Sequence, residues 1–260
     1  MKLTIKEMQQ YQLEMLKIIA EVCRREHIDY LLHGGNLLGA IRHGGPIPWD
    51  YDTDILVPEH QIDVFCRHLE KALAPKFRIH YHKLHGGSML YFPRICMEGY
   101  ESNVCHIDIF RLVGFPDDPK QQQAIVKRVA FIRKMMVLKG RKRMDSFRKN
   151  LLLQMSKLLL APVSRSRLLA AYNRACSKYP YEQANYAGYL AGRWGVKNIF
   201  PREIFDSSIT VEYAGIPVRI VKDYDGFLTR LYGDYRKLPP KAEQEEAMKK
   251  TYIVEELHHD

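Results

Sequence analysis

The sequence predicts an α/β (α+β) fold, in which a mixed-sheet core is followed by a mainly helical, basic region. Apolar residues make up 46% of the chain and charged residues 27%, an ordinary balance for a globular protein. Short strand-like runs alternate with amphipathic helical segments over residues 1–118, and beyond this point the helical pattern dominates. We therefore expect a core over 1–118, a basic helical region over 119–200 and a C-terminal segment over 201–260 that packs back on the core.

Hydrophobic spacing and turn residues define the individual elements. Apolar residues from Ile5 to Val22 recur at helical spacing, and Asn36 is suited to cap a short helix that Gly44 and Gly45 end. The expected elements of the core are a helix over 5–26, a strand over 28–32, a short helix over 37–42, an extended segment over 49–57, a helix over 59–73, and strands over 77–81, 89–96 and 104–110. The C-terminal segment should contain a β-hairpin with strands over 208–211 and 216–220, and a helix over 224–232.

The net charge of +10 comes from one region of the chain. Between Lys120 and Lys178 there are 16 basic residues and one acidic residue. Such a patch usually faces a polyanion, namely nucleic acid, anionic lipid or a phosphate-rich substrate, although a solvated helix face is an alternative. Residues 147–169 combine leucines with lysines and arginines, which is the composition of a helix lying in a membrane interface. We expect an anionic membrane surface as a partner, with packing of these leucines on the core as the alternative.

The sequence also predicts where the protein works. Its longest apolar stretch, 151–163, is interrupted by polar residues and falls short of the ~20 residues that a spanning helix needs. The N-terminus has no apolar signal core, and the five cysteines are scattered, as in a reducing compartment. We therefore expect a cytoplasmic protein that associates peripherally with the inner face of the membrane.

Three aspartates stand at alternate positions after a glycine-rich turn. Residues two apart in an extended segment point the same way, so Asp50, Asp52 and Asp54 are expected to share one face. A hard divalent cation, Mg²⁺ or Mn²⁺, would offset their mutual repulsion. A solvated acidic strand is the alternative, but aspartate is a poor strand former. An EF-hand is excluded because its glycine and glutamate are missing at the required offsets.

A fourth carboxylate, Asp108, lies in an otherwise largely apolar strand. The Gly34-Gly35 turn leads into a short helix ahead of the acidic segment, and N–H groups at such a turn can hold phosphate. Carboxylates on two neighbouring strands would hold a metal ion that bridges the same phosphate. This combination is the arrangement of nucleotidyltransferase-type sites, so we predict a nucleotidyltransferase-like core.

The run from Gly35 to Asp54 resembles the signature of the LicD family of phosphocholine and related phosphoalditol transferases, which includes the fukutin-type ribitol-phosphate transferases. The run reads Gly-x-Leu-Leu-Gly-Ala-x-Arg-His and ends in Ile-Pro-Trp-Asp-Tyr-Asp-Thr-Asp, and the similarity extends to Ile107–Phe110, Ile216-Pro217 and Tyr232–Tyr235. The resemblance implies Mg²⁺-dependent transfer of a phosphorylated alcohol from a CDP-linked donor to a glycan hydroxyl, with release of CMP. We take phosphocholine from CDP-choline as the first candidate, and a cell-surface glycan or its lipid-linked precursor as the acceptor.

Each candidate residue has an expected role in this interpretation. Asp52, Asp54 and Asp108 are the expected catalytic residues, and Asp108 is the candidate to accept the proton of the attacking hydroxyl. The expected metal ligands are Asp50, Asp52, Asp54 and Asp108. The expected substrate-binding residues are Gly34, Gly35, Asn36, Arg42, His43, Trp49 and Arg94. Aromatic faces suit a trimethylammonium group, and the candidates for that contact are Trp49, Tyr51, Tyr91, Phe92, Tyr186, Tyr189 and Trp194.

Two other functions would use the same features differently. A nucleotidyltransferase acting on RNA or on a small molecule would need the same carboxylates, and its nucleic-acid groove would carry aromatic residues for base stacking. Residues 120–160 contain only Phe131 and Phe147 as aromatics, so no nucleic acid is expected as a partner. A membrane-surface adaptor without catalysis would not require the intact carboxylates.

Overall fold

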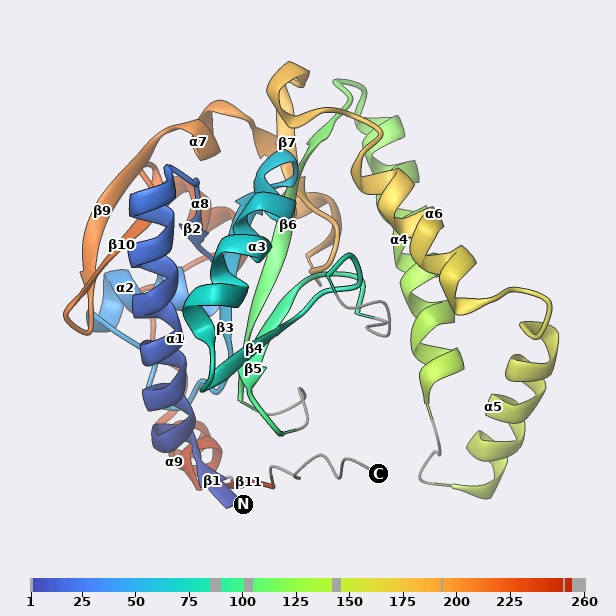
Figure 1. Cartoon of the computed structure of the whole chain (residues 1–260), viewed down its shortest axis with the longest axis horizontal. Coiled ribbons are helices and arrows are strands. Elements are labelled where there is room, and N and C mark those ends of the chain that lie inside the picture. The colour runs from blue at the N-terminus through green and yellow to red at the C-terminus, as the bar shows by residue number, and fades with distance from the viewer. Residues whose placement is uncertain are drawn as a thin grey trace.

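A mixed sheet forms the centre of the molecule (Figure 1), as the sequence predicts, and it has seven strands in the part of the chain that the structure describes. The computed structural model describes residues 2–84, 90–100, 105–141, 146–192, 194–249 and 251–253. Within them the strand order is β2-β3-β6-β5-β4, and β7 pairs with β6 and with β8. The strands β3 and β6 run parallel, and the other pairs in this sheet are antiparallel.

The elements follow one another with short connections. The strands are β1 (Lys2–Thr4), β2 (Leu31–Leu32), β3 (Thr53–Pro58), β4 (Phe77–His80), β5 (Arg94–Met97), β6 (His106–Phe115), β7 (Tyr186–Tyr189), β8 (Phe200–Pro201), β9 (Ser208–Tyr213), β10 (Ile216–Val221) and β11 (Thr251–Ile253). The α-helices are α1 (Ile5–Glu26), α2 (Gly34–His43), α3 (Ile62–Leu73), α4 (Pro119–Gly140), α5 (Phe147–Leu159), α6 (Arg165–Cys176), α7 (Glu203–Asp206), α8 (Tyr224–Tyr232) and α9 (Lys241–Met248). Three single-turn helices are η1 (Glu59–Gln61), η2 (Tyr181–Gln183) and η3 (Gly195–Asn198).

The first helix begins and ends where the sequence predicts. Thr4 and Glu7 form a capping box at its N-terminus, which satisfies two backbone N–H groups that would otherwise lack partners. Its apolar face, including Met8, Leu16 and Ile19, is buried against the sheet and α3. Figure 1 shows α1 and α3 side by side over the same face of the sheet.

Two expected strand boundaries differ from the structure. The acidic strand begins at Thr53 instead of Trp49, because the carbonyls of Ile47, Asp50 and Tyr51 accept hydrogen bonds from side chains of α1 and not from a neighbouring strand. The strand expected over 28–32 is limited to Leu31–Leu32. Met89 and Val104, at which two other strands were expected to begin, lie outside the described residues.

The region expected to be a helical insert also contributes to the sheet. Helices α4 and α6 pack against each other and bury a second apolar cluster with Val113 and Phe115 of β6. After α6 the chain returns to the sheet, and β7 pairs with the second half of β6. The helical part therefore ends at Cys176, and the short apolar run 186–189 is a core strand that the local sequence did not distinguish from a loop.

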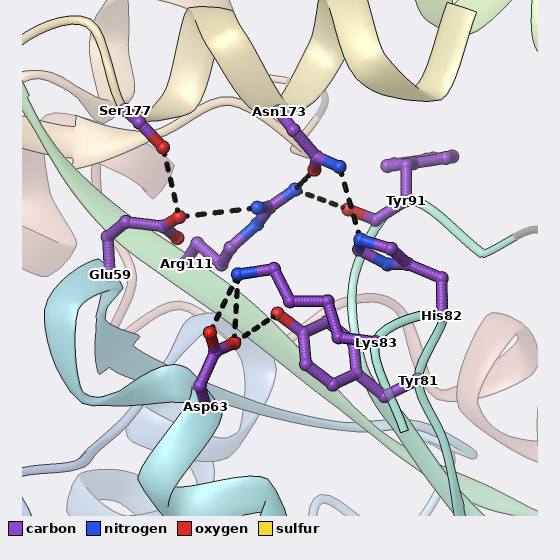
Figure 2. A network of polar contacts seen from close by, with 9 residues as sticks. All are labelled: Glu59, Asp63, Tyr81, His82, Lys83, Tyr91, Arg111, Asn173 and Ser177. Atoms are coloured by element: carbon purple, nitrogen blue, oxygen red, sulfur yellow. Dashed lines mark hydrogen bonds and ion pairs between the residues drawn. The ribbon is translucent and has the colours of Figure 1, made fainter. Parts of the chain in front are cut away.

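A buried arginine joins the helical part to the sheet. Arg111 of β6 donates hydrogen bonds to the Asn173 side chain of α6 at 2.7 Å and to the Tyr91 carbonyl at 2.8 Å, and it lies 3.4 Å from the Glu59 carboxylate (Figure 2). Asn173 also contacts His82, at 3.1 Å. Because the Arg111 side chain is buried, these contacts fix α6 relative to the strand that carries Asp108.

Replacing Arg111 by Met should lower the free energy of unfolding by about 2–3 kcal/mol, because it removes a buried guanidinium that bonds the partly exposed Glu59 carboxylate and the half-buried Asn173 amide. Urea denaturation measures this change. The exposed Arg128 of α4 provides the matched control, since Arg128→Met should change stability by no more than about 0.5 kcal/mol. Equal changes in stability for Arg111→Met and Arg128→Met would contradict the claim that the Arg111 contacts hold α6 on the sheet.

The C-terminal elements pack against β2, α1 and α2. The predicted hairpin is present as β9 and β10, which turn at Ala214-Gly215, and the helix over 224–232 is present as α8. Strand β10 contacts β2 and α1, and β9 contacts α2. None of the described helices is both long and apolar enough to cross a membrane.

Candidate active site

The sheet brings two of the predicted carboxylates side by side. Asp54 of β3 and Asp108 of β6 are register partners in the parallel pair, and neighbouring strands lie about 4.8 Å apart. Asp50 and Asp52 belong to the loop that enters β3, and their carboxyl groups lie within hydrogen-bonding reach of each other. Asp54 interacts electrostatically with the other three carboxyls. The four predicted aspartates therefore form one acidic cluster.

Burial makes this cluster electrostatically unfavourable by itself. Burial and the neighbouring Asp52 raise the pKa of Asp50 to about 7. Burial, followed by the charges of Asp52, Asp108 and Asp50, raises the pKa of Asp54 well above its usual range, and the Arg94 charge opposes this shift. Among the described residues, the carboxyl groups of the cluster outnumber the cations beside them, so ionising all four at once is unfavourable without a further cation.

Among the described residues, the fold brings the basic side chain of Arg94 to the carboxylates, and His106 Nε2 also lies 3.8 Å from Asp108 Oδ1. Arg94 lies opposite Asp108 in the antiparallel β5–β6 pair. Its Nε donates to Asp108 Oδ1 at 2.5 Å and its Nη2 to Asp108 Oδ2 at 2.9 Å. Such bidentate pairs are strong and fix orientation, so Arg94 holds the Asp108 carboxylate in place at the edge of the cluster.

The glycine turn lies directly against the acidic cluster. Helix α2 begins at Gly34 instead of Leu37, with His33 at its N-cap. Gly34 has φ +58°, a conformation that favours glycine, and a Cβ there would meet Asp54 Oδ2 at 3.6 Å. A Cβ on Gly35 would come within 2.3 Å of Asp50 Oδ2. The positive end of the α2 dipole therefore faces carboxylates, and would equally suit a phosphate.

Asn36 has a different role from the one expected. It lies inside α2 and does not cap it. Its Oδ1 accepts a hydrogen bond from the Asp54 backbone N–H at 2.7 Å, and its Nδ2 donates to the Asp52 carbonyl at 3.2 Å. Since the same Nδ2 also lies 3.3 Å from the Tyr213 hydroxyl, the amide joins three segments of the chain. Asn36 is a positioning residue for the acidic segment, and its buried amide is committed to the protein itself.

Two glutamines of α1 hold the acidic loop from the other side. Gln9 Nε2 donates to the carbonyls of Ile47 and Asp50, at 2.9 and 2.7 Å. Gln12 Nε2 donates to the Tyr51 carbonyl at 2.8 Å and to the His106 carbonyl at 3.0 Å. Sequence reasoning did not select these residues. The signal was present, however, because Gln12 interrupts the apolar face of α1 four residues after Met8 and four before Leu16.

Two predicted substrate-binding residues, Arg42 and His43, lie at the end of α2 remote from the acidic cluster. Arg42 and His43 end α2, about 12 Å along the helix axis from Gly34 at 1.5 Å per residue. The Arg42 guanidinium donates to the Tyr235 carbonyl at 3.0 Å, so it anchors the C-terminal segment. The Trp49 ring lies edge-on to His43, with centroids 5.7 Å apart. Helix α2 presents its N-terminus, and not Arg42 and His43, to the acidic cluster, and a role of these residues in substrate binding stays a prediction.

Aromatic side chains line the same face of the sheet as Asp108. Phe110 shares its strand face, stacks on Tyr189 at 5.3 Å and meets Phe92 edge-on at 5.0 Å. Next to the glycine turn, the half-buried rings of Trp194 and Tyr232 meet at 5.2 Å. The Tyr232 hydroxyl would lie 3.8 Å from a Cβ on Gly34. Among the predicted aromatic candidates, Trp194 therefore comes close to the turn with a partly accessible ring.

Replacing Gly35 by Ala should reduce activity with little loss of stability. The added methyl forces the Asp50 carboxylate to move, and a side-chain terminus can move at small energetic cost while alanine favours the helix. We expect a fall of at least about tenfold in turnover, because a displaced group loses its place in the reacting geometry. Enzyme assay and thermal denaturation measure the two effects. In an Asp50→Ala background the same substitution should have no further effect on turnover, and an undiminished additional loss would contradict the proposed contact.

The donor set fits a hard divalent cation. The described residues contain no group of three or more His, Cys, Asp and Glu side chains already arranged as a metal site. Nevertheless, four carboxyls converge beside a helix N-terminus, and Arg94 is paired with Asp108. Oxygen ligands and unneutralised negative charge are the properties that Mg²⁺ and Mn²⁺ require.

Sequence comparison with known proteins matches the part of the chain that carries the acidic cluster. The family model described as "LicD/FKTN/FKRP, nucleotidyltransferase domain" matches residues 27–163, which include the glycine turn and all four aspartates. The "Lipopolysaccharide cholinephosphotransferase LicD" of Haemophilus influenzae is 30% identical over 273 aligned residues, which cover 97% of this chain and 99% of that protein. The mouse and human proteins named "Ribitol 5-phosphate transferase FKRP" are each 48% identical over 42 residues, which are 16% of this chain and 8% of theirs. With a family match over more than half of its length and a relative aligned from end to end, this chain belongs to the LicD family.

Proposed function

We propose that this protein transfers phosphocholine from CDP-choline to a hydroxyl of a glycan, with release of CMP. The observation that carries the proposal is the register of β3 and β6, which places Asp54 beside Asp108 at the N-terminus of α2. The end-to-end similarity to a lipopolysaccharide cholinephosphotransferase supports the class of donor and acceptor. Lipopolysaccharide or another surface glycan, in free or lipid-linked form, is the proposed acceptor.

The residues divide the work of binding the donor. The backbone N–H groups of Gly34 and Gly35 would bind donor phosphate at the positive end of α2. Asp50, Asp52, Asp54 and Asp108 would hold Mg²⁺ or Mn²⁺, which supplies positive charge to the diphosphate oxygens when bound. The paired rings of Trp194 and Tyr232 offer aromatic faces to the trimethylammonium group, a contact of about 0.5–2 kcal/mol.

Transfer then requires one displacement at phosphorus. The acceptor hydroxyl oxygen forms a bond to the phosphorus of phosphocholine, the bond from that phosphorus to the bridging oxygen breaks, and CMP leaves. We propose that Asp108 accepts the hydroxyl proton, and that Arg94 positions its carboxylate for this task. Gln9, Gln12 and Asn36 keep the acidic segment in place during the step.

A ligand-binding screen tests the class of donor. Thermal denaturation or calorimetry with CDP-choline, CDP-ethanolamine, CDP-ribitol and CDP-glycerol should show Mg²⁺-dependent binding, strongest for CDP-choline. CTP and single-stranded RNA serve as probes of the alternative function, a nucleotidyltransferase. Preference for CTP with RNA over every CDP-alcohol would overturn the proposed function.

A further inference from the structure

Helix α5 exposes most of its apolar side chains, whereas a helix that only packs on its own protein buries them. Leu153 is buried, with 3% of its surface exposed. Most of its other apolar residues face outward at helical spacing and are 54–81% exposed, namely Leu151, Leu152, Met155, Leu158 and Leu159. The alternative that the leucines of 147–169 pack on the protein itself therefore holds for Leu153 and for Leu168 and Leu169 of α6, but not for the four exposed leucines of α5.

This apolar surface is concentrated in one place. Of the twelve large hydrophobic side chains that the described residues expose, five lie on α5 and two more, Phe131 and Val137, on α4. Single exposed hydrophobic residues are common on protein surfaces, whereas a group on one helix indicates an interaction site. Lys139 of α4 donates to the Leu160 carbonyl at 2.7 Å, which holds the end of α5 with its apolar side outward.

The side chains around the exposed apolar residues of α5 are basic, which favours an anionic partner. Residues 146–178 contain no aspartate or glutamate. Arg148 and Lys149 are exposed on α5, and Arg165 and Arg167 are exposed at the start of α6. The exposed apolar side chains of α5 are leucines and a methionine, which do not stack on bases as the aromatic residues of a nucleic-acid site do. Exposed aliphatic residues bordered by basic residues are the pattern of a helix that lies in a membrane interface.

The exposed apolar surface of α5 lies at the same end of the molecule as the acidic cluster. Strand β6 and helix α4 are both about 33 Å long, at 3.3 and 1.5 Å per residue. The chain reverses direction between them, and Figure 1 shows α4 running back toward the end of the molecule at which β6 begins. Helix α5 lies at that end, and Asp108 is near the start of β6. The Arg111–Asn173 contact keeps the helical part fixed on the sheet.

We propose that α5, together with the adjoining ends of α4 and α6, docks this protein on an anionic lipid bilayer. The leucines and Met155 enter the interface, and the basic side chains contact lipid headgroups. The membrane site does not depend on the chemistry of transfer. If the proposed function also holds, docking would present the carboxylates to an acceptor anchored in the same bilayer.

Vesicle flotation with the full-length protein tests the proposal. Binding should occur on vesicles of phosphatidylethanolamine with about one third phosphatidylglycerol, should be weak on phosphatidylcholine, and should fall with rising salt. The triple variant Arg148→Gln, Lys149→Gln and Arg165→Gln should bind about 100-fold more weakly, since each basic residue near an anionic surface contributes about fivefold. The variant Leu152→Gln, Leu158→Gln and Leu159→Gln should bind at least about 10-fold more weakly.

Matched controls separate the patch from general effects of charge and polarity. Lys6, Arg24 and Lys71 are exposed on α1 and α3, and their replacement by Gln should leave binding unchanged within about twofold. The exposed residues Val64 and Leu238 serve in the same way for the leucine variant. All substituted residues are exposed, so melting temperatures should be preserved. Absence of vesicle binding, or equal loss in the controls, would overturn the proposal, as would a stable dimer that the leucine variant converts to monomer while vesicle binding persists.

Discussion

Replacing Asp54 by Asn should lower phosphocholine transfer by at least about 100-fold while leaving the metal-free protein as stable as the wild type or more so. The two results have one cause. The wild-type carboxyl lies in a buried cluster in which three other carboxyls oppose its charge, and burial with these neighbours raises its pKa. An amide of the same size removes that repulsion, and at the same time removes an anionic ligand from the site.

The pH dependence gives this prediction a definite sign. A carboxyl whose pKa is raised in the folded state costs stability once the unfolded chain can ionise it, above about pH 4. The melting temperature of Asp54→Asn, measured in EDTA, should therefore gain on that of the wild type as pH rises from 4 to 8. Asp118→Asn is a suitable control, because Asn can replace Asp at the N-cap of α4 and should change neither activity nor this difference. A constant difference in melting temperature would contradict the electrostatic account of Asp54.

Replacing Asp108 by Asn should abolish measurable transfer and, unlike the change at Asp54, destabilise the protein. Asp108 is the partner of the Arg94 guanidinium, and only 12–13% of either side chain is exposed. Removal of one member of such a pair leaves a poorly solvated charge, which we expect to cost up to about 3 kcal/mol with the other aspartates nearby. The same substitution, Asp to Asn, is thus expected to preserve or raise stability at Asp54 and to lower it at Asp108.

A double variant distinguishes the structural from the chemical role of Asp108. Asp108→Asn combined with Arg94→Met should recover most of the lost stability, because neither charge then remains without its partner, but should recover no transfer. Calorimetric titration with CDP-choline provides the second measurement. If proton acceptance is the main role of Asp108 and the other three aspartates suffice to hold the metal, Asp108→Asn should bind the donor about as well as the wild type. Loss of donor affinity with unchanged turnover would instead identify Asp108 as a ligand, and the proton acceptor would have to be another group.

Local sequence patterns predicted those features of the fold that depend on one short segment of the chain. Carboxylates predicted on two neighbouring strands, Asp54 and Asp108, lie side by side, and the bounds of α1 and the β9–β10 hairpin were visible in the sequence. The glycine turn was also predicted next to the acidic segment, because two glycines before a short helix permit close approach.

Other features depend on contacts between distant segments. Asn36 has the side chain of a helix cap, but its amide bonds the acidic segment because α2 begins earlier and lies against β3. Arg42 follows the glycine turn closely in sequence, yet the length of the helix carries it to the C-terminal segment. Strand β7 is short and mostly non-branched, so its place in the sheet follows from the free edge that β6 offers and not from its own propensity.

The most direct test of the account is transfer itself, measured with purified protein, CDP-choline and lipopolysaccharide that lacks phosphocholine. The assay follows CMP and phosphocholine incorporation together, with Mg²⁺ or with excess EDTA, for the wild type and Asp54→Asn. We predict equal amounts of CMP and incorporated phosphocholine with Mg²⁺, and almost none with EDTA or with the variant. Transfer that continues at the wild-type rate in EDTA, or in Asp54→Asn, would contradict the claim that the acidic cluster carries a metal-dependent phosphotransferase activity.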